Sequence, residues 1–188
     1  MDEDDKRILQ KKLLLACTDN KPLDEIKELV KEHKKHNVPF KTDILNLSIW
    51  TNPSVERVQY FIDHMDQKVD QGTVVRVLDV GSLDVLKLLE KYIDITNVPA
   101  VDIQCRSRNP DISMLKYLLE EKKLQRPLET EINKLKLFRD DPGRKERIKY
   151  LCPDYDFNST EQLNISMVND KKFLKTDAGK KFLKTVKN

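Results

Sequence analysis

Glycine, cysteine and aromatic residues are all scarce in this sequence: its 188 residues include four glycines and three cysteines, and only 6% are aromatic. Cys17, Cys105 and Cys152 are widely spaced and odd in number, which excludes a disulfide framework or a zinc ribbon. No stretch reaches the roughly 18 apolar residues of a membrane span. The acidic first residues are followed by no apolar run, so no secretory signal is predicted. We expect a reduced cytoplasmic protein, with the nucleus as the alternative.

Motifs of several enzyme classes are missing as well. There is no glycine-rich phosphate loop and no G-x-S-x-G nucleophile elbow. A catalytic cysteine would need a depressed pKa, whereas each of the three cysteines occupies a position within a repeat described below, where small buried side chains are common. We therefore expect no enzymatic activity and no cofactor, and a Cys or His active site is the least favoured hypothesis.

Two histidines have a spacing found in some metal sites. His33 and His36 lie three residues apart and could share one helix face. No cysteine or third histidine is near them in sequence, and the intervening Lys34 and Lys35 would repel a cation. We interpret the pair as part of a solvated helix end and expect no metal site.

Apolar and charged residues are nearly equal in number, at 38% and 36%. This balance is poorer in apolar residues than an ordinary globular domain. Elongated repeat proteins have such a composition because they are one or two helices thick and much of their surface stays wet. A disordered chain is the other explanation, but the regular apolar spacing argues against it.

A five-residue phrase recurs along the chain, with an apolar residue, Lys or Gln, any residue, Leu or Phe, and then usually an apolar residue. It occurs at Ile26–Val30 (IKELV), Val58–Ile62 (VQYFI), Leu86–Glu90 (LKLLE), Leu115–Leu119 (LKYLL) and Ile148–Cys152 (IKYLC), in steps of 32, 28, 29 and 33 residues. Apolar residues at i, i+3 and i+4 share one face of a helix, and the residue at i+1 points away from it. Each phrase therefore predicts a short helix that must stack on its neighbours to bury its apolar stripe.

A turn and a second apolar segment precede each phrase. Asn20, Asn52 and Asn109 stand six residues before their phrases, and Gly81 and Asp140–Gly143 mark the other two turns. The apolar segments are 13–17, 44–50, 74–78, 101–105 and 132–138. Residues 74–78 and 101–105 have strand propensity, but their place in the repeat favours helices. The unit is then helix, tight turn, helix and a linker of roughly eight to twelve residues.

The turn and second helix at Asn20–Val30 and Gly81–Leu89 resemble those of the ankyrin repeat, a family whose unit has two antiparallel helices and an extended finger. Asp154–Asn158 is similar to a finger that leads into another first helix. The resemblance covers most of residues 8–175. The Thr-Pro-Leu-His opening of the family is nowhere intact, with Thr42–Leu45 the nearest match, and glycine is rarer than the family's turns require.

The predicted fold is all-α, an α-solenoid of about five to six ankyrin-like helix-turn-helix repeats. A tetratricopeptide or HEAT-like array is the structural alternative. We expect one repeat domain over residues 1–170, whose charged residues 1–12 form an N-terminal cap with Ile8 and Leu9 facing inward. Residues 171–188, which hold seven lysines against one aspartate, are predicted to be a basic cap helix or tail.

The resemblance implies that a partner binds a concave surface formed by the finger tips and the exposed face of the first helices. Near the ends of the first helices stand Trp50, Arg76, Arg106, Arg108, Phe138 and Arg139. Trp and Arg are enriched in binding hot spots. Core packing of Trp50 and Phe138 and ordinary solvation of the arginines are the alternatives. A row of arginines beside Trp50 predicts an acidic or mixed partner surface.

We expect an intracellular adaptor or inhibitor that binds a protein and is monomeric alone. The second hypothesis is a nucleic-acid- or membrane-associated factor that acts through the basic segment. That segment contains Lys171, Lys172, Lys180 and Lys181. Two aromatic residues and no arginine accompany its lysines, which disfavours nucleic-acid binding.

Overall fold

The computed structural model describes residues 1–40, 44–107 and 109–157. All regular structure in these ranges is helical, and no strand occurs in them, which confirms the all-α prediction. The elements are α1 (Glu3–Thr18), α2 (Leu23–Lys35), α3 (Ile44–Thr51), α4 (Val55–His64), α5 (Gln71–Val80), α6 (Leu83–Leu89), η1 (Ile95–Asn97), α7 (Ala100–Arg106), α8 (Ser113–Lys116), η2 (Tyr117–Glu121), α9 (Glu129–Lys136) and α10 (Pro142–Leu151). No helix in the described ranges is both long and apolar enough to cross a membrane.

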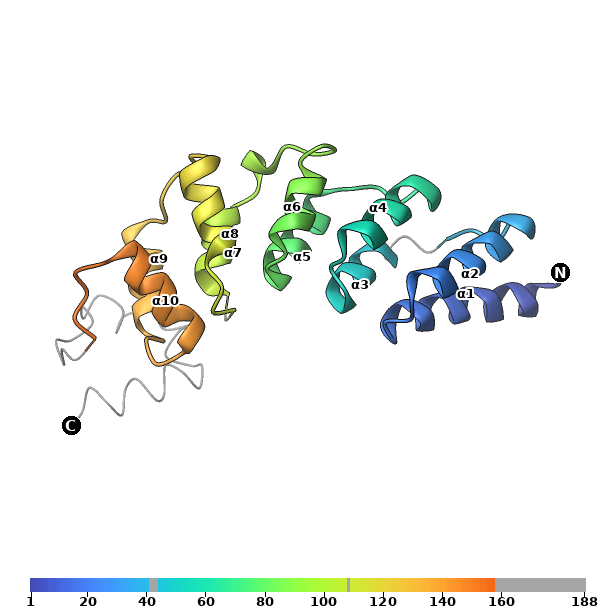
Figure 1. Cartoon of the computed structure of the whole chain (residues 1–188), viewed down its shortest axis with the longest axis horizontal. Helices are drawn as coiled ribbons and strands as arrows, with labels where there is room; N and C mark the ends of the chain where they lie inside the picture. Colours follow the sequence, from blue (N-terminus) through green and yellow to red (C-terminus); the bar gives the residue numbers. More distant parts are fainter. Residues whose placement is uncertain (41–43, 108, 158–188) are drawn as a thin grey trace.

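The helices form five successive pairs that stand side by side in an elongated row (Figure 1). The first helices α1, α3, α5, α7 and α9 each pack against the next first helix, and we call them the first-helix layer. The second helices α2, α4, α6, α8 with its continuation η2, and α10 each pack against the first helix of their own pair, and we call them the second-helix layer. The core lies between the two layers.

The recurring phrase explains how the second helices are buried. All five phrases lie in helices, as predicted, with the last residues of the third and fifth phrases, Glu90 and Cys152, as C-caps. The first residue of every phrase is buried, and the fourth residue is buried in all but the first phrase, where Leu29 is half-buried against the core. These buried residues are Ile26, Val58, Phe61, Leu86, Leu89, Leu115, Leu118, Ile148 and Leu151. The fifth residue is fully buried only in the first phrase, as Val30. The buried stripe therefore runs along the i and i+3 positions, and the i+4 position lies at its edge.

The two segments with strand propensity are helical. Val74–Leu78 lies in α5, whose start is fixed because the Asp70 carboxylate accepts a hydrogen bond from the Thr73 backbone N–H at 2.8 Å. Gly81 ends α5 with a left-handed φ of 77°. A Cβ atom there would also lie 2.7 Å from the Asn109 side-chain nitrogen, so two consecutive turns meet at this glycine.

Two expectations near the ends of the array need correction. The charged N-terminal residues belong to one helix, α1, which runs from Glu3 to Thr18. Leu9 is buried as predicted, but Ile8 is 53% exposed and does not face inward. It lies seven residues from the exposed Leu15, on the side of α1 opposite to Leu9 and Leu13. At the other end, α9 stops at Lys136, so the apolar segment 132–138 is helical only in its first part.

Buried arginines join consecutive pairs at their turns, and we call Arg57 and Arg147 the arginine latches. Each immediately precedes its phrase and reaches back to the turn of an earlier pair. Arg57 donates to the carbonyl of Lys21. Arg147 donates from Nε to the Gln104 carbonyl at 2.6 Å and from its Nη atoms to the carbonyls of Asn109, Gly143 and Asp111. The latches thus add side-chain hydrogen bonds to backbone carbonyls in or beside the turns of the array.

Candidate functional site

The outer side of the second-helix layer is held together by its own side chains. The second residue of each of the first four phrases contacts a tyrosine of the following pair. These rungs are Lys27 over the Tyr60 ring at 5.9 Å, Gln59 donating to the Tyr92 hydroxyl at 2.8 Å, Lys87 over the Tyr117 ring at 4.7 Å, and Lys116 over the Tyr150 ring at 5.8 Å. We call them the lysine–tyrosine ladder. These second residues point away from the core, as predicted, but they serve contacts between pairs rather than water alone.

Carboxylates complete the pairing of charges in this layer. The Tyr117 hydroxyl donates to Glu90 at 2.7 Å, and Lys122 also contacts that carboxylate at 2.8 Å. The Tyr150 hydroxyl donates to Glu120 at 2.7 Å, and burial together with this bond raises the pKa of Tyr150 to about 12. These bonds again join one pair to the next.

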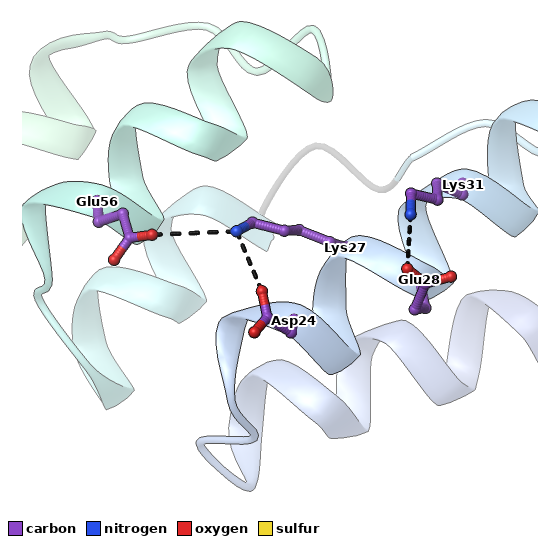
Figure 2. A network of polar contacts seen from close by, with 5 residues as sticks. All are labelled: Asp24, Lys27, Glu28, Lys31 and Glu56. Atoms are coloured by element: carbon purple, nitrogen blue, oxygen red, sulfur yellow. Dashed lines mark hydrogen bonds and ion pairs between the residues drawn. The ribbon is translucent and has the colours of Figure 1, made fainter.

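A carboxylate also joins α2 to α4 of the following pair (Figure 2). The Lys27 ammonium group lies between Asp24, at 3.1 Å, and Glu56 of the following pair, at 4.0 Å. Lys31 and Glu28 form a further pair within α2 at 2.6 Å. Lys27, Lys31 and the carboxylates that they contact thus have partners within the chain.

The first-helix layer is different, because it exposes a large aromatic side chain. Trp50, in the last turn of α3, is 58% exposed. Arg76 reaches it from α5, and its guanidinium carbon lies 5.0 Å from the centre of the Trp50 ring. Among the described residues, no ion pair is recorded between Arg76 and a carboxylate. The structure therefore brings together two of the predicted partner-binding residues and leaves both accessible, which rules out core packing for Trp50.

The remaining predicted residues do not join this pair. Arg106 at the end of α7 donates to Glu131 of α9 at 3.1 Å, and Glu131 also binds Lys134 at 2.6 Å. The bonds from Lys134 and Arg106 lower the pKa of Glu131, so the charge of Arg106 is already balanced within the chain.

Phe138 and Arg139 lie half-buried in the turn between α9 and α10. The Arg144 guanidinium covers the Phe138 ring at 4.1 Å, and Arg139 donates to the Tyr155 hydroxyl at 3.5 Å. The Phe138 ring is thus covered by an arginine of its own pair. Outside the described residues lie Arg108 and the tail residues Lys171, Lys172, Lys180 and Lys181.

Sequence reasoning missed two carboxylates, one that pairs with Arg106 and one that follows Arg76 on α5. Glu131 neutralises Arg106 from 25 positions further along the chain, which no local pattern reveals. Asp79 is exposed on α5, three residues after Arg76. The i to i+3 spacing on a predicted helix was a sufficient signal for Asp79.

The thiols of Cys17 and Cys105 are poorly suited to nucleophilic chemistry. Burial raises the pKa of Cys17 to about 11 and that of Cys105 to about 12. Both side chains are therefore protonated at neutral pH, whereas the thiolate is the reactive species.

The interpretation of His33 as part of a solvated helix end is wrong. His33 is buried, its Nδ1 lies 2.8 Å from the Leu29 carbonyl oxygen, and its ring stacks on Phe40 with centroids 5.3 Å apart. Its Nε2 has no hydrogen-bond partner, and burial lowers its pKa. His36 remains exposed. In the described part of the chain, no group of three or more His, Cys, Asp or Glu side chains could hold a metal ion.

Comparisons of the chain with protein-family models, curated proteins and solved structures find no match. Trp50 and Arg76 are therefore the predicted partner-binding residues that the structure brings into contact, with the Trp50 ring exposed.

Proposed function

We propose that the chain is an ankyrin-like helical-repeat module that binds a partner protein on the exposed face of its first-helix layer. The proposal assigns the chain a holding role as an intracellular adaptor or inhibitor, active as a monomer, with no catalytic step. Two features support the repeat assignment: the phrase recurs every 28 to 33 residues, and each recurrence forms the second helix of a stacked pair.

The observation that carries the binding role is the exposure of Trp50 beside Arg76. A tryptophan that is 58% exposed leaves a large apolar surface in water, although burial of that surface would be favourable. The tyrosine rings that lysines cover in the second-helix layer, those of Tyr60, Tyr117 and Tyr150, are by contrast half-buried or buried. Trp and Arg are the side chains that most often dominate binding energy at interfaces. We therefore expect the partner to bury Trp50.

The test is an affinity capture from cell extract, followed by mass spectrometry, with the wild-type chain and the variant Trp50→Ala plus Arg76→Glu. Circular dichroism first establishes that the variant stays folded. Removal of a hot-spot pair is expected to weaken a bound protein by at least roughly 30-fold, which abolishes its capture.

The matched control is Tyr92→Ala plus Lys149→Glu. This variant likewise removes an exposed aromatic ring and reverses a charge, but Tyr92 follows α6 and Lys149 lies on α10. Because Tyr92 accepts a hydrogen bond from Gln59, circular dichroism also establishes that the control stays folded. Retention of the partner by the control and its loss from the first variant is the expected result. Equal capture by all three proteins would contradict the proposal.

Deletion of residues 171–188 separates this role from the basic-segment alternative. If capture were unchanged by the Trp50 and Arg76 substitutions but vanished on deletion, with a steep dependence on salt, the basic segment would be the binding element.

A further inference from the structure

The chemistry of the Trp50–Arg76 pair selects a kind of ligand. The contact of the Arg76 guanidinium with the Trp50 ring is a cation–π contact, which depends on the charge and uses none of the N–H donors in a hydrogen bond to a carboxylate. Those donors match the two oxygens of a carboxylate. Because Arg76 has no recorded ion pair within the described residues, its fork is available, in contrast to that of Arg106, which Glu131 occupies.

The surroundings of Arg76 combine a negative charge with apolar surface. α5 carries the exposed residue Asp79 three positions after Arg76. α3 presents the Trp50 ring, and the preceding first helix, α1, exposes Leu15 at 45%. A bond from the Thr51 hydroxyl to the Cys17 carbonyl at 2.8 Å fixes the end of α3 against that of α1. Asp79 weakens the attraction of Arg76 for a negative charge, whereas Trp50 and Leu15 offer apolar surface to a neighbouring side chain.

We infer that the Trp50–Arg76 pair receives an acidic peptide segment of the partner protein, with an Asp or Glu carboxylate on the Arg76 guanidinium and an adjacent apolar side chain on the Trp50 indole. This inference rests on the proposed function and specifies its ligand.

The experiment uses a display library of random 12-residue peptides selected on the full chain, and synthetic copies of the enriched peptides measured by fluorescence polarisation. We expect the enriched peptides to carry Asp or Glu next to an aromatic or aliphatic residue. Arg76→Glu is expected to weaken their binding by roughly 30-fold or more, and Arg76→Lys by about three- to tenfold, because lysine keeps the charge but loses the planar fork.

Asp79→Asn provides a readout that general damage to the site would not produce. Removal of a nearby negative charge is expected to strengthen binding of an acidic peptide by about two- to threefold, a typical effect for exposed charges. Replacement of the peptide's acidic residue by Lys should restore binding to Arg76→Glu. Arg106→Glu, the matched control, is expected to change binding less than about twofold.

Enrichment of peptides without carboxylates would overturn the inference. So would a loss of affinity in Asp79→Asn, unchanged binding in Arg76→Glu, or no enrichment at all. A partner captured from extract through Trp50 and Arg76 would still support the proposed function if the peptide selection failed. Failure of both experiments would remove the function and the inference together.

Discussion

Replacement of Arg147 by Met should open the last two helices while the first pairs stay folded. The Arg147 side chain is completely buried, and its guanidinium donates to the carbonyls of Gln104, Asn109, Gly143 and Asp111. The structure records no ion pair for it among the described residues, so carbonyl oxygens are the groups that solvate this charge.

The size of the effect follows from these bonds. A hydrogen bond to a charged group contributes about 1.5–3 kcal/mol, but desolvation of the guanidinium offsets several kcal/mol of the total. Arg147→Met removes the charge and leaves neutral carbonyls, each of which costs about 1–3 kcal/mol where it stays buried and unpaired, while burial of the apolar Met side chain recovers about 1 kcal/mol. We expect Arg147→Met to cost about 3 kcal/mol, which is a little over a hundredfold in the local opening equilibrium.

Hydrogen exchange measured by mass spectrometry tests the size and the location together. Repeat arrays contact only their neighbours, so a local defect can open one end. Amides of α9 and α10 should exchange roughly a hundred times faster in Arg147→Met, with α1 to α4 unchanged. Lys149→Met, on the exposed side of the same helix, is the control and loses only its ion pair with Glu146. Faster exchange along the whole chain, or no change in α9 and α10, would refute the reasoning.

Three further predictions concern buried groups. Burial lowers the pKa of His33, so on acidification the imidazole is protonated in the unfolded chain at a higher pH than in the folded chain. The free energy of unfolding should therefore fall as the pH drops below about 6.5, and urea unfolding of His33→Phe should lack this pH dependence. At neutral pH, a thiol reagent should modify the half-exposed Cys152 quickly and reach Cys17 and Cys105, with pKa values of about 11 and 12, only on unfolding. Gly81→Ala should lower the unfolding free energy by more than about 1 kcal/mol, because it adds a clash to a left-handed φ.

Each of these predictions has its own control and its own contrary result. His36→Gln changes an exposed histidine and should leave the pH dependence intact; a dependence that survives His33→Phe would contradict the assignment. For the thiols, equally fast modification of all three cysteines in the folded protein would be inconsistent with their burial. Gly72→Ala adds a Cβ at 3.2 Å from an Asp70 carboxylate oxygen without a positive φ, so it should cost less than Gly81→Ala.

The period of the apolar residues was enough to predict the helices of the second layer. Ile26, Leu86 and Leu115 recur at helical spacing, and such a stripe is buried wherever a neighbour covers it. The same reasoning assigned Val74–Leu78 to a helix against its strand propensity, because its position in the repeat outweighed propensity. The end of α9 was placed too late, since an apolar Phe138 continues the pattern but packs in a turn.

The sites where charges are buried or shared could not be predicted in this way. Arginine is rarely fully buried, so nothing in the sequence distinguished Arg147 from a solvated side chain. The exposure of Trp50 depends on which side of α3 faces the core. The eight residues of α3 carry apolar side chains on several sides, so their pattern did not predict that orientation. One signal was present and went unused: the third residue of the phrase is tyrosine in the second, fourth and fifth phrases.

The ladder also restricts which unit of the array can follow which. A unit fits behind another when its tyrosine meets the side chain at the second phrase position of its predecessor. The fourth phrase, LKYLL, carries both the lysine and the tyrosine, so a copy of that unit could follow itself. The first phrase, IKELV, has the lysine but no tyrosine and suits only the start of an array. The units are therefore not interchangeable. A duplicated unit near the C-terminal end would form the tyrosine contact with its predecessor, whereas a duplicate of the first unit would lack that contact.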